Sequence, residues 1–108
     1  MTDRELLELA AKAAGLVHAK WSDACDEMIT PSEHHSRFRR AGDWNIWNPL
    51  TDDGDAFRLM VKLGIHYSWN NDSHVELVSE VVTANDDRYA AARRAITRAA
   101  AEMGRKQQ

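Results

Sequence analysis

The chain has little cysteine, no long apolar run and no excess of positive charge. Cys25 is the only cysteine in 108 residues, so no intramolecular disulfide can form, which fits a reducing compartment. No apolar run approaches the roughly 18–20 residues of a membrane-spanning helix, and the acidic start, Met1 to Glu5, is unlike a signal peptide. We therefore expect a cytoplasmic protein with no membrane contact.

The charge balance and the missing motifs narrow the function classes. The net charge of −3 argues against nucleic acid as a direct ligand, because nucleic-acid binders usually carry a clear basic excess. No Walker loop, dinucleotide fingerprint, nucleophile elbow or paired-cysteine site is present. We therefore expect a protein that is not an enzyme, with no catalytic residues, no cofactor and no bound metal.

Length and composition predict one globular domain over residues 1–108. The hydrophobic fraction of 44% and the charged fraction of 29% are those of a folded chain rather than a disordered one. A chain of 108 residues is near the commonest size of one domain and too short for two ordinary ones.

Three helices are predicted from apolar periodicity, at about residues 3–14, 52–63 and 86–103. Each has a residue before it that can cap its first turn: Thr2, Thr51 and Asn85. Each has a glycine placed to end it: Gly15, Gly64 and Gly104.

Strands are predicted between the helices. Residues 16–21 and 44–50 read as a strand pair around a long, variable loop at about 22–41, where Pro31 breaks any helix. Residues 65–69 and 74–83 alternate apolar and polar side chains around an Asn-rich turn, which predicts a hairpin with a bulge near Ser79. The predicted fold is α+β, with a small, mostly antiparallel sheet of about four strands packed with three helices in the order αββαββα.

Three segments resemble the phage ABA-sandwich domain family of small phage and prophage proteins. They are the string Trp47-Asn48-Pro49-Leu50-Thr51-Asp52-Asp53-Gly54-Asp55-Ala56 with the following Leu59 and Val61 to Ile65, the opening Thr2 to Gly15, and Tyr89 to Ile96. The resemblance implies a phage or prophage origin, a layered αβα fold and no catalytic residues. The stretch at about 22–41 departs from the shorter hairpin expected of the family, so a specialised function could have been added there.

Two groups of side chains could in principle bind metal. Asp52, Asp53 and Asp55 with Asn48 suggest a hard-cation site, but the spacing is not that of an EF-hand, and acidic residues in a first helical turn explain the pattern better.

The second group is Cys25, His34 and His35. Its irregular spacing and single cysteine are weak signals for zinc or for a cysteine nucleophile, so a solvated loop is the preferred interpretation.

The best candidates for partner contact lie just before the family-like string. They are Arg37, Phe38, Arg39, Arg40 and Trp44. Arginine pairs bidentately with phosphate or with acidic protein surfaces, and an exposed tryptophan is a frequent interface hot spot. For Trp47 and Trp69 we expect core positions instead.

These candidates lead to three function hypotheses. The first is a phage accessory protein that inhibits a host protein, such as a component of a CRISPR-type or other anti-phage defence complex, by steric blocking. The second is a small-ligand or nucleotide-binding protein that sequesters a signalling molecule. The third is a metal-dependent enzyme using the acidic residues 52–55. A homodimer through an exposed strand edge is a further expectation.

Overall fold

The computed structural model describes residues 1–31, 44–65, 67–70, 74–77, 81–83 and 87–107, and for the strands between 67 and 83 it describes the backbone. The helices are α1 (Asp3–Ala13), α2 (Asp53–Leu63) and α3 (Arg88–Lys106). The strands are β1 (Lys20–Ser22), β2 (Glu27–Pro31), β3 (Trp44–Ile46), β4 (Tyr67–Asn70), β5 (His74–Leu77) and β6 (Val81–Thr83). No helix in the described part of the chain is long and apolar enough to cross a bilayer.

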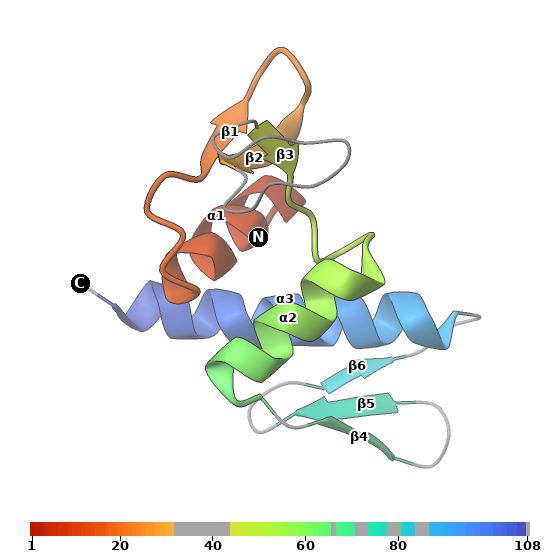
Figure 1. The fold of residues 1–108 in the computed structure, drawn as a ribbon. Coiled ribbons are helices and arrows are strands. Elements are labelled where there is room, and N and C mark those ends of the chain that lie inside the picture. Colours follow the sequence, from red (N-terminus) through yellow and green to blue (C-terminus); the bar gives the residue numbers. More distant parts are fainter. Residues whose placement is uncertain (32–43, 66, 71–73, 78–80, 84–86, 108) are drawn as a thin grey trace.

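The strands form two separate antiparallel sheets. The first sheet has the order β1-β2-β3 and the second the order β4-β5-β6. Figure 1 shows α3 running across the middle of the molecule, with α1 and the first sheet on one side and the second sheet on the other. Helix α2 crosses α3 and joins the two halves.

The α+β class and the three helices are confirmed, but the arrangement of the strands is partly wrong. In place of one sheet of about four strands, the described residues form two sheets of three. Strand β2 lies inside the stretch expected to be a loop, and the expected strand 74–83 is two strands. The proposed bulge at Ser79 lies outside the described residues. β2 was missed because Pro31 ends it and because its partner β3 follows only after residues 32–43.

The helix ends depend on local chemistry. The Thr2 hydroxyl accepts the Glu5 N–H at 3.1 Å, as expected. Gly15 and Gly64 follow their helices with positive φ angles of 73° and 67°, also as expected. The other two predicted caps are wrong, because an aspartate nearer the helix does the capping in both cases. These aspartates are Asp52, which replaces Thr51, and Asp87, which replaces Asn85.

Helix α3 continues past Gly104, which was expected to end it. Gly104 is buried where α3 crosses α1, and a Cβ at this position would collide with the backbone carbonyl of Leu9. The glycine is therefore needed for close helix packing and does not terminate the helix. Alanines line much of the remaining contact, including Ala10 and Ala100, neither of which has exposed surface.

The main core lies between α1, the first sheet, α2 and α3. Its buried members are alanines and larger aliphatic residues from the helical side together with Met28 and Trp47 from the side of the first sheet: Leu7, Ala10, Ala11, Ala14, Met28, Trp47, Ala56, Leu59, Ile96 and Ala100. The burial of Trp47 confirms its expected core position, with 9% of its surface exposed. The side chain of Trp69 lies outside the described residues.

Replacing Gly104 by alanine tests the close helix crossing. We expect Gly104→Ala to lower the free energy of unfolding by about 2 kcal/mol, because α1 and α3 must move apart. The control is Gly54→Ala in α2, where the added methyl meets mainly the flexible Arg58 side chain. Its effect should stay within about 1 kcal/mol, since alanine also favours the helix. Urea unfolding of both variants measures this, and equal effects would contradict the packing described.

Candidate functional site

Strand β3, at the edge of the first sheet, exposes two apolar side chains. Trp44 is 47% and Ile46 is 59% exposed. Side chains alternate along a strand, so both lie on the outer face of the sheet, while Asn45 between them faces inward. Lys20 lies on the same outer face, because it is paired with Ile29 of β2, which is in turn paired with Ile46. We call Lys20, Trp44 and Ile46 the β3 surface.

A cation–π contact holds the indole ring of this surface. The Lys20 Nζ lies 4.7 Å from the centroid of the Trp44 ring. Such a contact at an exposed site contributes about 0.5–1 kcal/mol. The β3 surface therefore presents a large aromatic ring in a preferred orientation, with a positive charge beside it.

Of the predicted partner-binding residues, Trp44 is the one that the structure describes. The others, Arg37, Phe38, Arg39 and Arg40, lie outside the described residues. Their place in the chain is nevertheless informative, because the flanking residues Pro31 and Trp44 are cross-strand partners. The connection that carries the arginines therefore leaves and rejoins the first sheet at the β3 surface.

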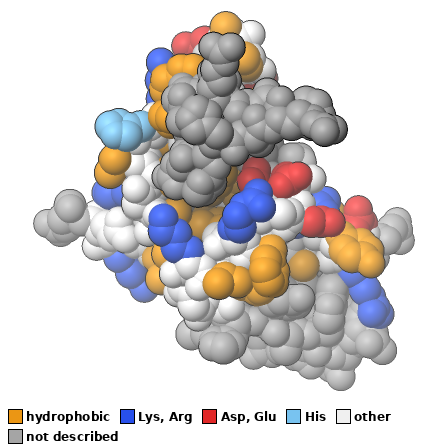
Figure 2. All heavy atoms as spheres, viewed as in Figure 1, with side chains coloured by type: hydrophobic (Ala, Val, Ile, Leu, Met, Phe, Trp, Pro, Cys, Tyr) orange, Lys and Arg blue, Asp and Glu red, His pale blue; other side chains and the backbone are white. Residues whose placement is uncertain are grey.

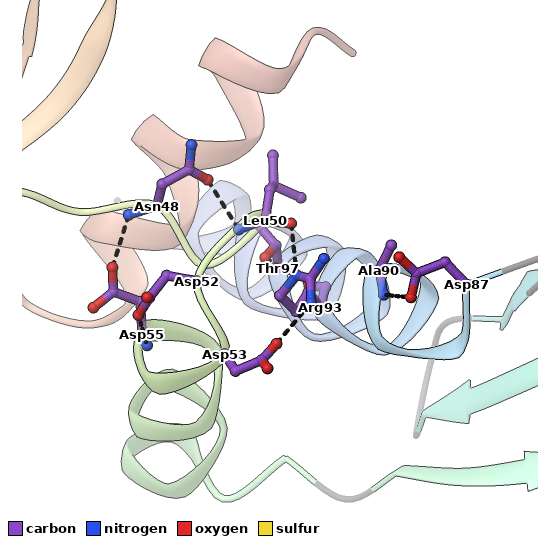
Figure 3. Close-up of polar contacts among 9 residues, drawn as sticks. All are labelled: Asn48, Leu50, Asp52, Asp53, Asp55, Asp87, Ala90, Arg93 and Thr97. Carbon is purple, nitrogen blue, oxygen red and sulfur yellow. Dashed lines mark hydrogen bonds and ion pairs between the residues drawn. The ribbon is translucent and has the colours of Figure 1, made fainter.

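The carboxylates at the start of α2 are used by the chain's own donors (Figure 3). The Asp52 carboxylate caps α2 by accepting the Asp55 N–H at 2.8 Å. The Asp55 carboxylate accepts the Asn48 N–H at 3.0 Å and an Arg58 N–H at 2.7 Å. The Asn48 side-chain oxygen in turn accepts the Leu50 N–H at 3.0 Å. This acidic cluster therefore fixes the turn into α2.

Arg93 ties this turn to α3, a role that the sequence does not reveal. Its guanidinium donates to the Leu50 carbonyl oxygen at 2.9 Å and to the Asp53 carboxylate at 2.6 Å. Its own carbonyl accepts the hydroxyl of the fully buried Thr97 at 2.8 Å. The partners of the guanidinium are 40 and 43 residues away in the chain, so no local pattern identifies it.

The candidate metal ligands do not form a metal site among the described residues. Within the described ranges, no group of three or more histidine, cysteine, aspartate or glutamate side chains is placed to hold a metal ion. Cys25 is exposed, and its proposed zinc partners His34 and His35 lie outside those ranges.

A hollow of about 740 Å³ opens between α2, the first sheet and the end of α1. The inner face of the first sheet forms one wall, with Thr30, Asn45 and Trp47. The other wall is the face of α2 that carries Leu59 and Lys62. Figure 2 shows positive, negative and hydrophobic side chains close together on the side of the molecule that carries α2.

Comparisons with known proteins find no match for this chain, whether family models, curated proteins or solved structures are searched. The resemblance to the phage ABA-sandwich domain family therefore stays a prediction.

Replacing each of the two candidate N-cap residues of α2 by alanine tests the structural role of the acidic cluster. Asp52→Ala should lower the free energy of unfolding by about 1 kcal/mol, since it removes the cap. Thr51→Ala should have a smaller effect, because no hydrogen bond of its hydroxyl to another described residue is present. Thermal unfolding with and without Mg²⁺ measures both. A larger effect of Thr51→Ala, or stabilisation by Mg²⁺ that Asp52→Ala removes, would contradict this role.

Proposed function

We propose that the protein is a phage or prophage accessory protein that binds a host protein through the β3 surface and inhibits it by steric blocking. In this proposal it acts in the host cytoplasm and performs no chemical step. The supporting observation is that Trp44 and Ile46 are exposed side by side on an edge strand of the first sheet. A component of an anti-phage defence complex is the proposed class of target.

The energetic argument rests on Trp44. A tryptophan buries 150–250 Å² when fully covered, so covering its exposed 47% removes roughly 100 Å² from water. At about 25 cal/mol per Å² this contributes roughly 2.5 kcal/mol before the costs of association. Tryptophan and arginine dominate interface hot spots, and a ring already oriented by Lys20 loses less freedom on binding.

Charge favours the β3 surface over the other exposed apolar pair. Phe57 and Val61 lie one turn apart on α2 and are 60% and 62% exposed. Arg58, which follows Phe57, is paired with Asp55, whereas Lys20 of the β3 surface lies against the Trp44 ring. Arg40 precedes Trp44 by four residues in the sequence. An acidic partner surface would meet both the ring and these cations.

The two exposed apolar pairs provide a matched test. In the double variant Trp44→Ala with Ile46→Ser, the affinity for a host protein captured from a lysate should fall at least about tenfold, because the loss exceeds 1.4 kcal/mol. The control is Phe57→Ser with Val61→Ser, which removes a similar area from α2 and should keep the affinity.

Affinity measurement with the purified captured protein, together with urea unfolding of both variants, separates binding from folding. Equal losses in the two variants, or a loss confined to the α2 variant, would contradict the proposal.

A further inference from the structure

The hollow beside α2 contains hydrogen-bond donors that have no acceptor among the described residues. Its carboxylates, Asp52 and Asp55, are engaged by the backbone and by Arg58. Arg58 is itself shared between them, at 2.7 Å from Asp55 and 4.0 Å from Asp52. Arg58 therefore balances the charge of Asp55, and the Asp52 carboxylate lies at the N-terminus of α2, where the helix dipole offsets a negative charge.

Lys62 and Asn45 remain unused. No hydrogen bond or ion pair joins the side chain of either residue to the described part of the chain. Lys62 lies seven residues after Asp55, on the α2 face that lines the hollow. Asn45 lies opposite Thr30 on the inner face of the first sheet. An ammonium and an amide thus line the same hollow with no partner in the part of the chain that the structure describes.

The position of Asn45 is unusual for an amide. On the same inner face, Met28 and Trp47, whose N–H donates to the Met28 carbonyl oxygen at 2.9 Å, belong to the core with 2% and 9% exposure. Asn45 and Thr30 continue this face beyond the core, where the sheet borders the hollow. A polar pair on an otherwise apolar face is expected where the face meets water or a ligand.

The rest of the lining suits an apolar molecule. Leu16 follows α1, Trp47 follows β3 and Leu59 lies on α2, and all three contribute apolar side chains to the lining. The volume of about 740 Å³ lies within the range of small-molecule sites, roughly 300–1,000 Å³.

We propose that this hollow binds a small organic anion, a carboxylate or a phosphate monoester carried on an apolar body. The Lys62 ammonium pairs with the anionic group, the Asn45 amide donates a hydrogen bond to it, and the apolar body packs against Leu16 and Leu59. The excess of unused donors selects an anion, because such a ligand supplies acceptors only. This site shares Ile46 with the β3 surface but not Lys20 or Trp44, and it does not depend on the function proposed above.

Nuclear magnetic resonance titration of the full chain tests the site, with benzoate and phenyl phosphate as probes and benzyl alcohol as the neutral analogue. The amide signals of Asn45, Thr51 and Lys62 should shift at about 10 mM of either anion, a concentration that would occupy most of a site with a millimolar Kd. The anion that shifts them at lower concentration identifies the preferred head group. Benzyl alcohol should bind about tenfold more weakly, because it lacks the charge.

The variant Lys62→Gln should weaken binding of the anion about tenfold, since it removes the ion pair. The control Lys106→Gln removes the same charge from the exposed end of α3 and should leave the affinity unchanged. Capture of a host protein by Lys62→Gln should equal that by the unchanged protein, which distinguishes this site from the β3 surface. Absence of shifts at these amides with both anions, equal weakening by the two variants, or equal affinity for benzyl alcohol would overturn the proposal.

Discussion

The close approach of α1 to α3 is the contact on which the rest of the structure depends. It requires Gly104, because any side chain there would meet the Leu9 carbonyl. Helix α3 then serves as a common support for both halves of the molecule. It contacts α1 near its end, α2 along its middle, and β5 and β6 of the second sheet. Small side chains permit these contacts, since much of the buried surface of α3 is alanine.

The anchoring of α1 and α2 on α3 gives the first sheet two distinct faces. Its inner face contributes Met28 and Trp47 to the core and then continues as Thr30 and Asn45 beside the hollow. Its outer face carries the β3 surface, whose apolar residues have no role in the core. The two proposed binding regions therefore lie mainly on opposite faces of the first sheet and meet at Ile46 on β3. A partner can cover one face without filling the other.

The sequence predicted those features that local chemistry determines. Helix α1 was found because Thr2 caps it and its leucines repeat at helical spacing, and the burial of Trp47 followed from its size. The pairing of β4 with β5 followed from the alternation of residues 65–69 and 74–83, but the division of the strands into two sheets of three could not be predicted in this way. Strand β2 is short and contains polar residues, and its pairing with β3 depends on chain segments that are far apart.

The residues of the candidate site could likewise be predicted from the sequence only in part. Trp44 was recognised as an interaction candidate, and the structure places it on an exposed strand end. Arg93 and Lys62 were not singled out, because an arginine or lysine on an amphipathic helix usually indicates a solvated face. Their roles depend on tertiary contacts. Arg93 donates to a carbonyl oxygen 43 residues away, and Lys62 lines a hollow formed by three separate parts of the fold. Gly104 shows the same limit, since a helix-ending glycine and a helix-crossing glycine have the same local sequence signal.

Photo-crosslinking from single positions tests the central claim, that the protein acts through the β3 surface, most directly. A photoreactive phenylalanine derivative is placed at position 44 in one preparation and at position 57 in another, and each is irradiated in lysates of candidate bacterial hosts. Both positions are exposed and aromatic, so they should react equally well with random neighbours. The account predicts one discrete host-protein adduct from position 44 and none of comparable yield from position 57. An adduct formed only from position 57, or the same adducts from both positions, would contradict it.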